Sequence, residues 1–268
     1  MVFTTKYKYG ELKWPEIREY SKQNRVAIVP VGMIEDHGPH LPVNSDALTV
    51  EEICVRVART IPEEVVLLPT LQYGYSPHHM DFPGAITIRG NILTEFVMDI
   101  CRSLVRHGFR RILIVNGHGS NICFLEAAAR MTVIENPNSL CALVTWSDTS
   151  EFRTAFEKVR ESEAGGVSHA CELETSIYLY LKPELVDMRK AVKDISFPRS
   201  AHFWFDIDPG PVKMMEYWST LSKTGIMGDP TKATAKKGEI AVNSAVDGLV
   251  EVVKELRSRP IRERVDHH

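Results

Sequence analysis

The chain has 268 residues, of which 44% are apolar and 25% charged, a composition typical of a folded globular domain with a substantial core. Its net charge of -3 provides no basic patch for nucleic acid and favours a small-molecule partner. No apolar run reaches the roughly 18 residues of a membrane span, and the N-terminal segment lacks the apolar core of a signal peptide. Five cysteines without a CxxC pair indicate reduced thiols. We therefore expect a cytoplasmic protein without nucleic-acid or membrane partners.

Short apolar runs alternate with segments of helical periodicity in the first half of the chain. Strands are predicted at 26–31, 65–69, 111–115 and 140–146, and helices at 46–60, 92–107 and 122–134. Residues 73–90 are rich in Gly, Pro and His, which predicts a long functional loop. Strands that alternate with helices form parallel sheets covered on both faces. The expected fold is a three-layer α/β sandwich with a mostly parallel central sheet.

The second half carries weaker signals. A helix is predicted from 168 to 181, after a pair of glycines, and a final helix from 232 to 257. Residues 195–230 combine aromatics, Gly and Pro, which predicts loops with short elements. Because no linker divides the chain, we predict one domain over residues 1–268.

Polar clusters follow two predicted strands, and ligands bind at the carboxyl ends of the strands in open parallel sheets. Glu35 and His37 follow the first strand, His118 follows the third, and Asp46 begins a helix. Each has a simple structural explanation: a surface ion pair for Glu35 and His37, a helix cap for Asp46, a turn for His118. Their joint position at strand ends favours a shared site.

A third cluster comprises His169, Glu172 and Glu174. On a helix, His169 and Glu172 share one face and Glu174 points elsewhere, although a charged first turn is the structural alternative. Two histidines with three carboxylates suit Zn²⁺, Mn²⁺ or Fe²⁺, and a bridging carboxylate can hold two ions about 3.5–4 Å apart. The predicted ligands are Glu35, His37, Asp46, His118 and Glu172.

Five blocks resemble the creatininase (creatinine amidohydrolase) family over residues 25–245. They are VGMIEDHGPHLPVNSD (31–46), SPHHMDFPGAIT (76–87), NGHGSN (116–121), HACELETS (169–176) and TGIMGDPTKATAKKGE (224–239). The resemblance implies an α/β hexamer with two divalent ions per subunit. It places Glu35, Asp46 and His118 on one ion and His37, Asp46 and Glu172 on the other, with Asp46 bridging. It also implies that His169 handles protons.

Two departures bear on the substrate. Creatinine-hydrolysing members carry a glutamate ligand where this chain has Ser120, so Glu172 is expected to replace it. Residues 163–166 also lack the tryptophan expected before the catalytic histidine. Other branches of the family open a formamide on a pyrimidine precursor, degrade a cofactor-precursor peptide, or cleave a cyclic inosose ketone. Creatinine is therefore not the expected substrate.

The expected chemistry is attack of a metal-activated hydroxide on a carbonyl, with His169 passing a proton to the leaving group. Glu174 is predicted to assist by orienting His169 or a ligand, with a plain position on the helix surface as the alternative. The pocket is predicted to include His78, His79 and Asp81 from the long loop, unless that loop is exposed or lies in a subunit contact. Ser120 and Trp204 complete the predicted substrate-binding set.

Three functions remain open. The first is hydrolysis of a C–N bond in a cyclic amide or formamide. The second is hydrolytic C–C opening of a cyclic polyol ketone by the same metal centre. The third is a catalytically silent metal-binding or assembly protein, against which the presence of His169 and all five expected ligands argues.

Overall fold

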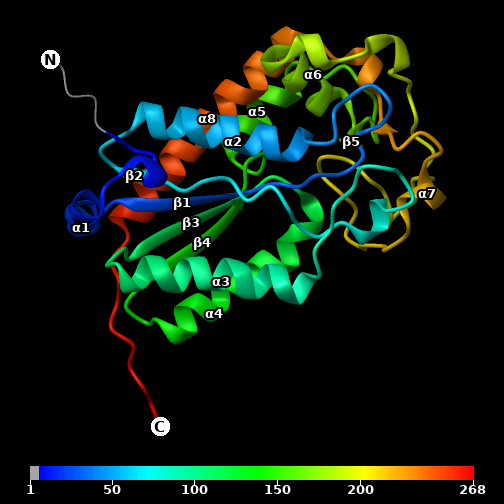
Figure 1. Cartoon of the computed structure of the whole chain (residues 1–268). Helices are drawn as coiled ribbons and strands as arrows, with labels where there is room; N and C mark the ends of the chain where they lie inside the picture. The colour runs from blue at the N-terminus through cyan, green and yellow to red at the C-terminus, as the bar shows by residue number, and fades with distance from the viewer. Residues whose placement is uncertain (1–5) are drawn as a thin grey trace, which may run out of the picture.

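The structure, a computed structural model, describes residues 6–268; residues 1–5, part of the segment in which no signal peptide is expected, lie outside the described residues. Four parallel strands form the central sheet in the order β2-β1-β3-β4 (Figure 1). Their bounds are Val26–Val31 for β1, Val65–Leu67 for β2, Arg111–Asn116 for β3 and Leu140–Thr145 for β4. All four predicted strands are present, although β2 is shorter than expected.

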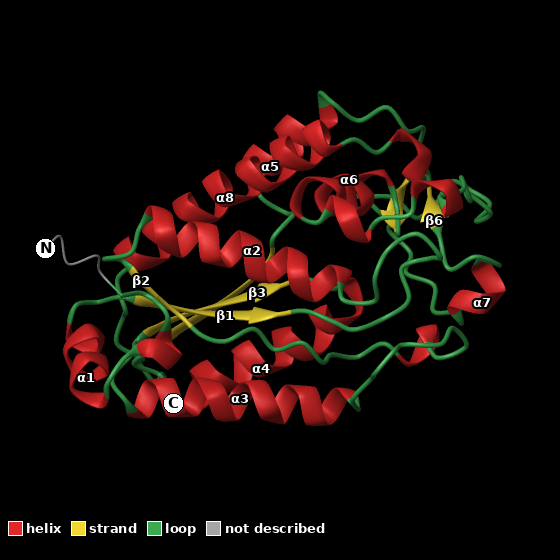
Figure 2. Ribbon diagram, turned by 45° about the horizontal axis from the view of Figure 1, so that its top comes forward, coloured by secondary structure: helices red, strands yellow, loops and turns green. Residues whose placement is uncertain are grey.

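Helices cover both faces of this sheet, as Figure 2 shows. One layer comprises α2 (Ser45–Thr60), α5 (Ser150–Glu157), α6 (Glu172–Leu181) and α8 (Ala235–Ser258). The other comprises α3 (Gly90–Arg106) and α4 (Ile122–Glu135). Because strand side chains alternate between faces, Ile28 packs into the core beneath the first layer and Val29 into the core beneath the second. The three-layer α/β sandwich is confirmed, whereas the single domain stays a prediction.

Two helices were not anticipated from the sequence. Helix α1 (Trp14–Lys22) has no buried residue, and α5 contributes only two, so neither has a long apolar face. Among residues 6–268, no helix is both long enough and apolar enough to cross a membrane.

The predicted helix from residue 168 begins four residues late. Val167–His169 instead forms strand β5, which pairs antiparallel with β6 (Met227–Gly228). Ala170 then adopts a positive φ of 50°, which breaks the chain direction before α6 begins at Glu172. Both short strands lie beyond the carboxyl ends of the main sheet, close to α7 (Trp218–Leu221) (Figures 1 and 2).

Helices α6 and α8 approach each other closely at Gly238. A Cβ atom at this position would lie 1.9 Å from the carbonyl oxygen of Ser176, an atom of the α6 backbone. Thr234, which caps α8, also donates its backbone N–H to the Ser176 hydroxyl at 3.1 Å. This contact fixes α6 against α8.

Gly238→Ala should therefore force the two helices apart and lower the free energy of unfolding by about 1–3 kcal/mol, the usual cost of overpacking. Asn243→Ala, at an exposed position of the same helix, should stay within about 0.5 kcal/mol of the parent protein. Urea denaturation followed by circular dichroism measures both. Equal stability of the two variants would contradict the close approach.

Candidate metal centre

Strands β1 and β3 bring two polar loops together. Val31 and Asn116, the last residues of these strands, are register partners, so the segments carrying Glu35 and His118 begin side by side. The Asn116 side chain donates to the His118 carbonyl at 2.8 Å and accepts from the His118 backbone N–H at 3.1 Å. These two bonds hold the His118 backbone in one conformation.

Asp46 enters the same space from the first turn of α2. The helix can approach because Gly32 has no side chain; a Cβ there would lie 2.4 Å from the Ala47 Cα atom. Asp46 is buried, with Oδ1 at 3.3 Å from His37 Nε2 and Oδ2 at 3.0 Å from His118 Nδ1. Each carboxylate oxygen therefore faces a different imidazole.

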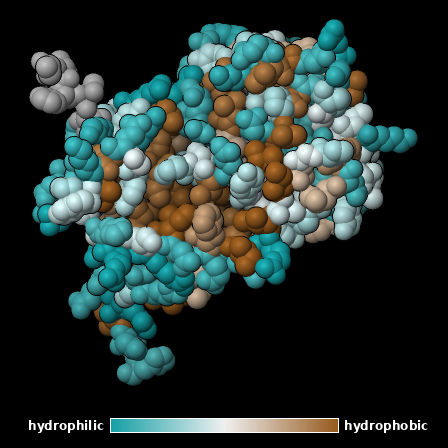
Figure 3. Space-filling view, in the orientation of Figure 1, coloured by the Kyte–Doolittle hydropathy of each residue, from teal (hydrophilic) through white to brown (hydrophobic). Residues whose placement is uncertain are grey.

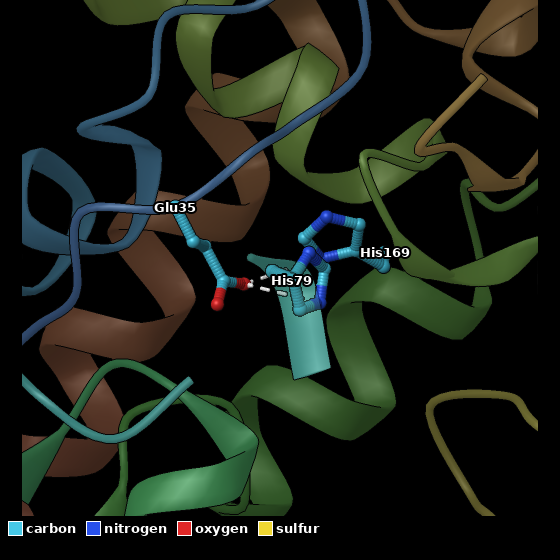
Figure 4. A group of neighbouring side chains, drawn as sticks. All are labelled: Glu35, His79 and His169. Atoms are coloured by element: carbon cyan, nitrogen blue, oxygen red, sulfur yellow. Dashed lines mark ion pairs between the residues drawn. The ribbon is translucent and has the colours of Figure 1, made fainter. Parts of the chain in front are cut away.

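Glu35 is the second carboxylate of the cluster and is fully buried. Its Oε1 atom lies 3.3 Å from His118 Nδ1, 3.6 Å from His169 Nδ1 and 3.9 Å from His79 Nε2. Figure 4 shows its carboxylate pointing toward the imidazoles of His79 and His169. Both Glu35 oxygens and His118 Nε2 lack a well-formed hydrogen bond among the described residues. Buried polar atoms left in this state fit a bound cation.

His169 and Glu174 complete the cluster. His169 belongs to β5, and its Nε2 atom lies 2.6 Å from the carbonyl oxygen of Asp36. A carbonyl only accepts, so Nε2 carries the proton and Nδ1 presents its lone pair toward Glu35. Glu174 Oε1 lies 3.9 Å from His37 Nε2.

Two groups of ligand atoms result, each compact enough to hold one metal ion. They are Glu35, Asp46 and His118, and His37, His169 and Glu174. Glu35, His79 and His169 form a third, overlapping group. Imidazole nitrogens and carboxylate oxygens suit Zn²⁺, Mn²⁺ and Fe²⁺, so the donors present fit such an ion.

Glu172 does not join the cluster, so the structure places it apart from the other four predicted ligands. Its carboxylate lies 2.5 Å from the buried Lys237 ammonium and accepts backbone N–H groups of Glu161 and Ser162. The prediction assumed that His169 and Glu172 shared a helical face, but His169 lies in a strand and α6 begins only at Glu172. Glu174 occupies the position expected of Glu172.

Three of the five predicted substrate-binding residues lie in or beside this cluster, and a fourth lies away from it. His79 lies within it, and His78 Nε2 is 3.2 Å from the Ser120 hydroxyl beside it. Asp81 is exposed and accepts from the Ser219 hydroxyl, so it does not line the cluster as predicted.

The fifth predicted residue, Trp204, does not cover the cluster either. Its indole N–H donates to the Asp208 carbonyl at 2.7 Å, and Arg199 lies over its ring. Trp218 instead covers the cluster, because its ring stacks on His79 with centroids 4.6 Å apart. No periodic pattern or motif around Trp218 indicates this position in the sequence.

Burial and charge shift the ionisation of the cluster strongly. Burial raises the pKa of Glu35 to about 7. Burial alone would lower the pKa of both histidines, but Asp46 and Glu35 beside them raise it, to about 10 for His37 and about 9 for His118. Burial opposes ionisation of Asp46 as well, yet the two imidazolium charges hold its pKa below the usual range. Without a bound cation, His37 and His118 are therefore protonated at neutral pH.

A parallel α/β sheet with buried imidazoles and carboxylates at the carboxyl ends of its strands is the arrangement of a metal-dependent enzyme class. The chain belongs to the creatininase family, because the family model described as creatinine amidohydrolase matches residues 10–253.

Curated relatives carry several hydrolase names. Creatinine amidohydrolase of Pseudomonas putida is 29% identical, covering 92% of this chain and 95% of the relative. A mycofactocin precursor peptide peptidase of Mycolicibacterium smegmatis is 31% identical, covering 85% and 84%. A 3-dehydro-scyllo-inosose hydrolase of Thermotoga maritima is 26% identical, covering 91% and 81%.

Solved structures of creatininases share the fold. One described as creatininase Mn has a TM-score of 0.81 at 29% identity and covers 94% of this chain and 99% of the neighbour. A mutant creatininase of Zn-Zn type has a TM-score of 0.80 at 28% identity and covers 96% and 100%. The fold, the cluster and these comparisons support a metal-dependent hydrolase.

Two matched variants separate the roles of the neighbouring glutamates. Glu174→Gln should lower bound metal, measured by elemental analysis after dialysis, because it removes a charged ligand beside His37. Glu172→Gln should keep its metal but lose about 1–3 kcal/mol of unfolding free energy, since the buried Lys237 ammonium loses one of its two carboxylate partners and keeps Glu161. The opposite pattern would restore Glu172 as the ligand.

Metal uptake should release protons, because metal binding requires neutral imidazoles and the raised pKa values keep His37 and His118 protonated at pH 7.5. Affinity should therefore fall as the pH is lowered. Calorimetric titration with Zn²⁺ in two buffers of different ionisation enthalpy counts the protons, and His118→Ala should reduce the number. Identical heats in both buffers would show that no proton is displaced.

Proposed function

We propose that this chain is a dinuclear metal-dependent hydrolase that opens a cyclic amide or cleaves a formamide C–N bond in a small polar molecule. One observation carries the proposal: Asp46 directs one carboxylate oxygen toward His37 and the other toward His118. A carboxylate in this arrangement can bridge two ions. Glu35, Asp46 and His118 would hold one, and His37, Asp46 and Glu174 the other. Neighbours described with Mn and Zn-Zn support Mn²⁺ and Zn²⁺, and Fe²⁺ suits the same donors.

Divalent ions in such a centre supply an activated water and polarise the substrate carbonyl. The residues of the chain then handle the protons. The Asp36 carbonyl fixes the His169 ring so that Nδ1 faces the centre, 3.6 Å from Glu35. Burial lowers the pKa of His169, as do the charges of nearby histidines, so the ring is neutral and its Nδ1 lone pair is free to take the proton released by the attacking water. It returns this proton to the leaving nitrogen.

Glu174 takes the part of a ligand in this proposal. The sequence predicted that it orients His169 or a ligand, and its Oε1 atom lies 3.9 Å from His37 Nε2. The other carboxylate oxygen of Glu174, Oε2, accepts a hydrogen bond from the Cys171 backbone N–H in a capping box at the start of α6. The start of the helix therefore holds the carboxylate in place as a ligand.

Hydrolytic C–C opening of a cyclic polyol ketone is the alternative, and the inosose hydrolase from Thermotoga maritima supports it. Both reactions begin with attack on a carbonyl, so the cluster alone serves either. Both reactions also need a proton, on a leaving nitrogen or on a leaving carbon, and His169 is a buried imidazole oriented to deliver one. The amide reaction is favoured because the relatives named creatinine amidohydrolase and mycofactocin precursor peptide peptidase belong to the amide-cleaving side. The mycofactocin peptidase relative extends the amide class to peptides.

The hexamer implied by the family resemblance stays a prediction. Figure 3 shows a band of apolar side chains across the middle of one face of the subunit. Apolar bands of this kind are commonly covered by another protein surface, which supports assembly with further copies.

His169→Ala should lower turnover by about 10²–10⁴-fold, the usual contribution of a general acid–base, while at least one ion per subunit remains bound. The assay incubates Zn²⁺- or Mn²⁺-loaded protein with cyclic amides, formamides, a short peptide and an inosose. Release of amine or formate supports C–N cleavage, and an open-chain carboxylate without nitrogen supports the alternative. His202→Ala, an exposed histidine, is the control. Unchanged turnover in His169→Ala would remove the proposed proton carrier.

A further inference from the structure

Trp218 is the aromatic side chain in closest contact with the histidines of the cluster. Its ring stacks on His79 at 4.6 Å between centroids and 23° between planes, and meets His169 edge-on at 5.1 Å and 75°. His78 lies edge-on to the same ring at 6.0 Å. These distances are those of rings in direct contact. Trp218 is buried, although it comes from a four-residue helix far from the ligands in sequence.

The orientation of this indole is fixed from behind. Trp218 Nε1 donates to the Gly225 carbonyl at 2.9 Å. Gly225 has a positive φ of 79°, and a Cβ atom there would lie 2.0 Å from Asp36 Oδ2. Only glycine therefore fits between Trp218 and the Asp36 segment, whose carbonyl also holds His169. Trp218 and His169 are thus positioned by two segments that pack against each other at Gly225 and Asp36.

A second bond joins α7 to the loop that carries His79. Ser219, next to Trp218, donates its hydroxyl to the exposed Asp81 carboxylate. The Trp218–His79 stack and the Ser219–Asp81 bond join the same two segments, residues 77–81 and 218–219. Asp81, which the sequence placed among the substrate-binding residues, therefore lies outside the cluster but helps to hold Trp218 against His79.

We propose that Trp218 is a specificity-determining residue whose ring forms the wall against the substituent next to the scissile bond, and that it selects substrates with a compact substituent. The proposal rests on the proposed function. Because Trp218 touches both His79 and His169, a substrate that reaches His169 on this side must contact the indole. A bulky substituent would have to displace the ring and break its bond to Gly225.

The first test compares five-membered cyclic amides whose ring carries hydrogen, methyl, propyl or benzyl. Trp218→Ala should raise the kcat/KM ratio of benzyl over hydrogen by at least about 10-fold, since single methylenes in a pocket change selectivity by about 10–200-fold. Trp218→Phe, which keeps a ring but loses the bond to Gly225, should give a smaller rise. Trp204→Ala is the matched control and should leave the ratio unchanged. An unchanged ratio in Trp218→Ala would overturn the proposal.

A second test does not depend on turnover. Co²⁺ quenches the fluorescence of a nearby tryptophan, and the chain has four tryptophans. Quenching by Co²⁺ should largely disappear in Trp218→Phe and persist in Trp204→Phe. The reverse result would place Trp218 away from the metal centre and overturn the proposal.

The two tests separate failure of the wall from failure of the proposed function. If the metal-loaded parent protein turned over none of these amides and none of the formamides, the proposed function would be wrong. Dissociation constants of the same series, measured by calorimetry, would then test whether Trp218 excludes bulky substituents. A benzyl-to-hydrogen affinity ratio that rises in Trp218→Ala supports it, and an unchanged ratio overturns it.

Discussion

The structure depends on one constraint, the burial of Asp46 between two imidazoles at the end of the parallel sheet. A buried carboxylate is costly unless charges or hydrogen bonds compensate it, and here His37 and His118 do so from opposite sides. The loops after β1 and β3 each bring a histidine to this carboxylate, and Gly32 and Gly117 in these loops let α2 approach closely enough to carry Asp46 between them. The same carboxylates that would share a cation with these histidines raise the pKa of both imidazoles, so cations and protons compete for the cluster.

Most of the centre could be predicted because strand ends are easy to recognise. The apolar runs that form β1 and β3 are short and continuous, and polar residues directly after them lie at one edge of a parallel sheet. Glu35, His37 and His118 follow from this rule, and Asp46 follows from the helix start beside them. The structure brings all four together, whereas their binding of metal stays a prediction.

The rest depended on contacts that local patterns do not encode. The choice of Glu172 over Glu174 assumed a helix through His169, but pairing of β5 with β6, almost 60 residues away, overrides that local preference. Glu172 and Lys237 then form a buried ion pair that joins the starts of α6 and α8. Trp218 escaped prediction for the same reason, because its segment has no periodicity and its role arises from a stack on a distant loop.

The pairing of β5 with β6 also determines when the centre can form. His169 Nδ1 reaches Glu35 only while its strand is held by Met227 and Gly228, which lie some 190 residues after Glu35 in the chain. During synthesis, the sheet strands and their first helices precede this segment by more than 80 residues. The centre is therefore completed late in synthesis, and a chain truncated before residue 227 would lack both the strand partner that orients His169 and helix α8, which packs on one face of the sheet.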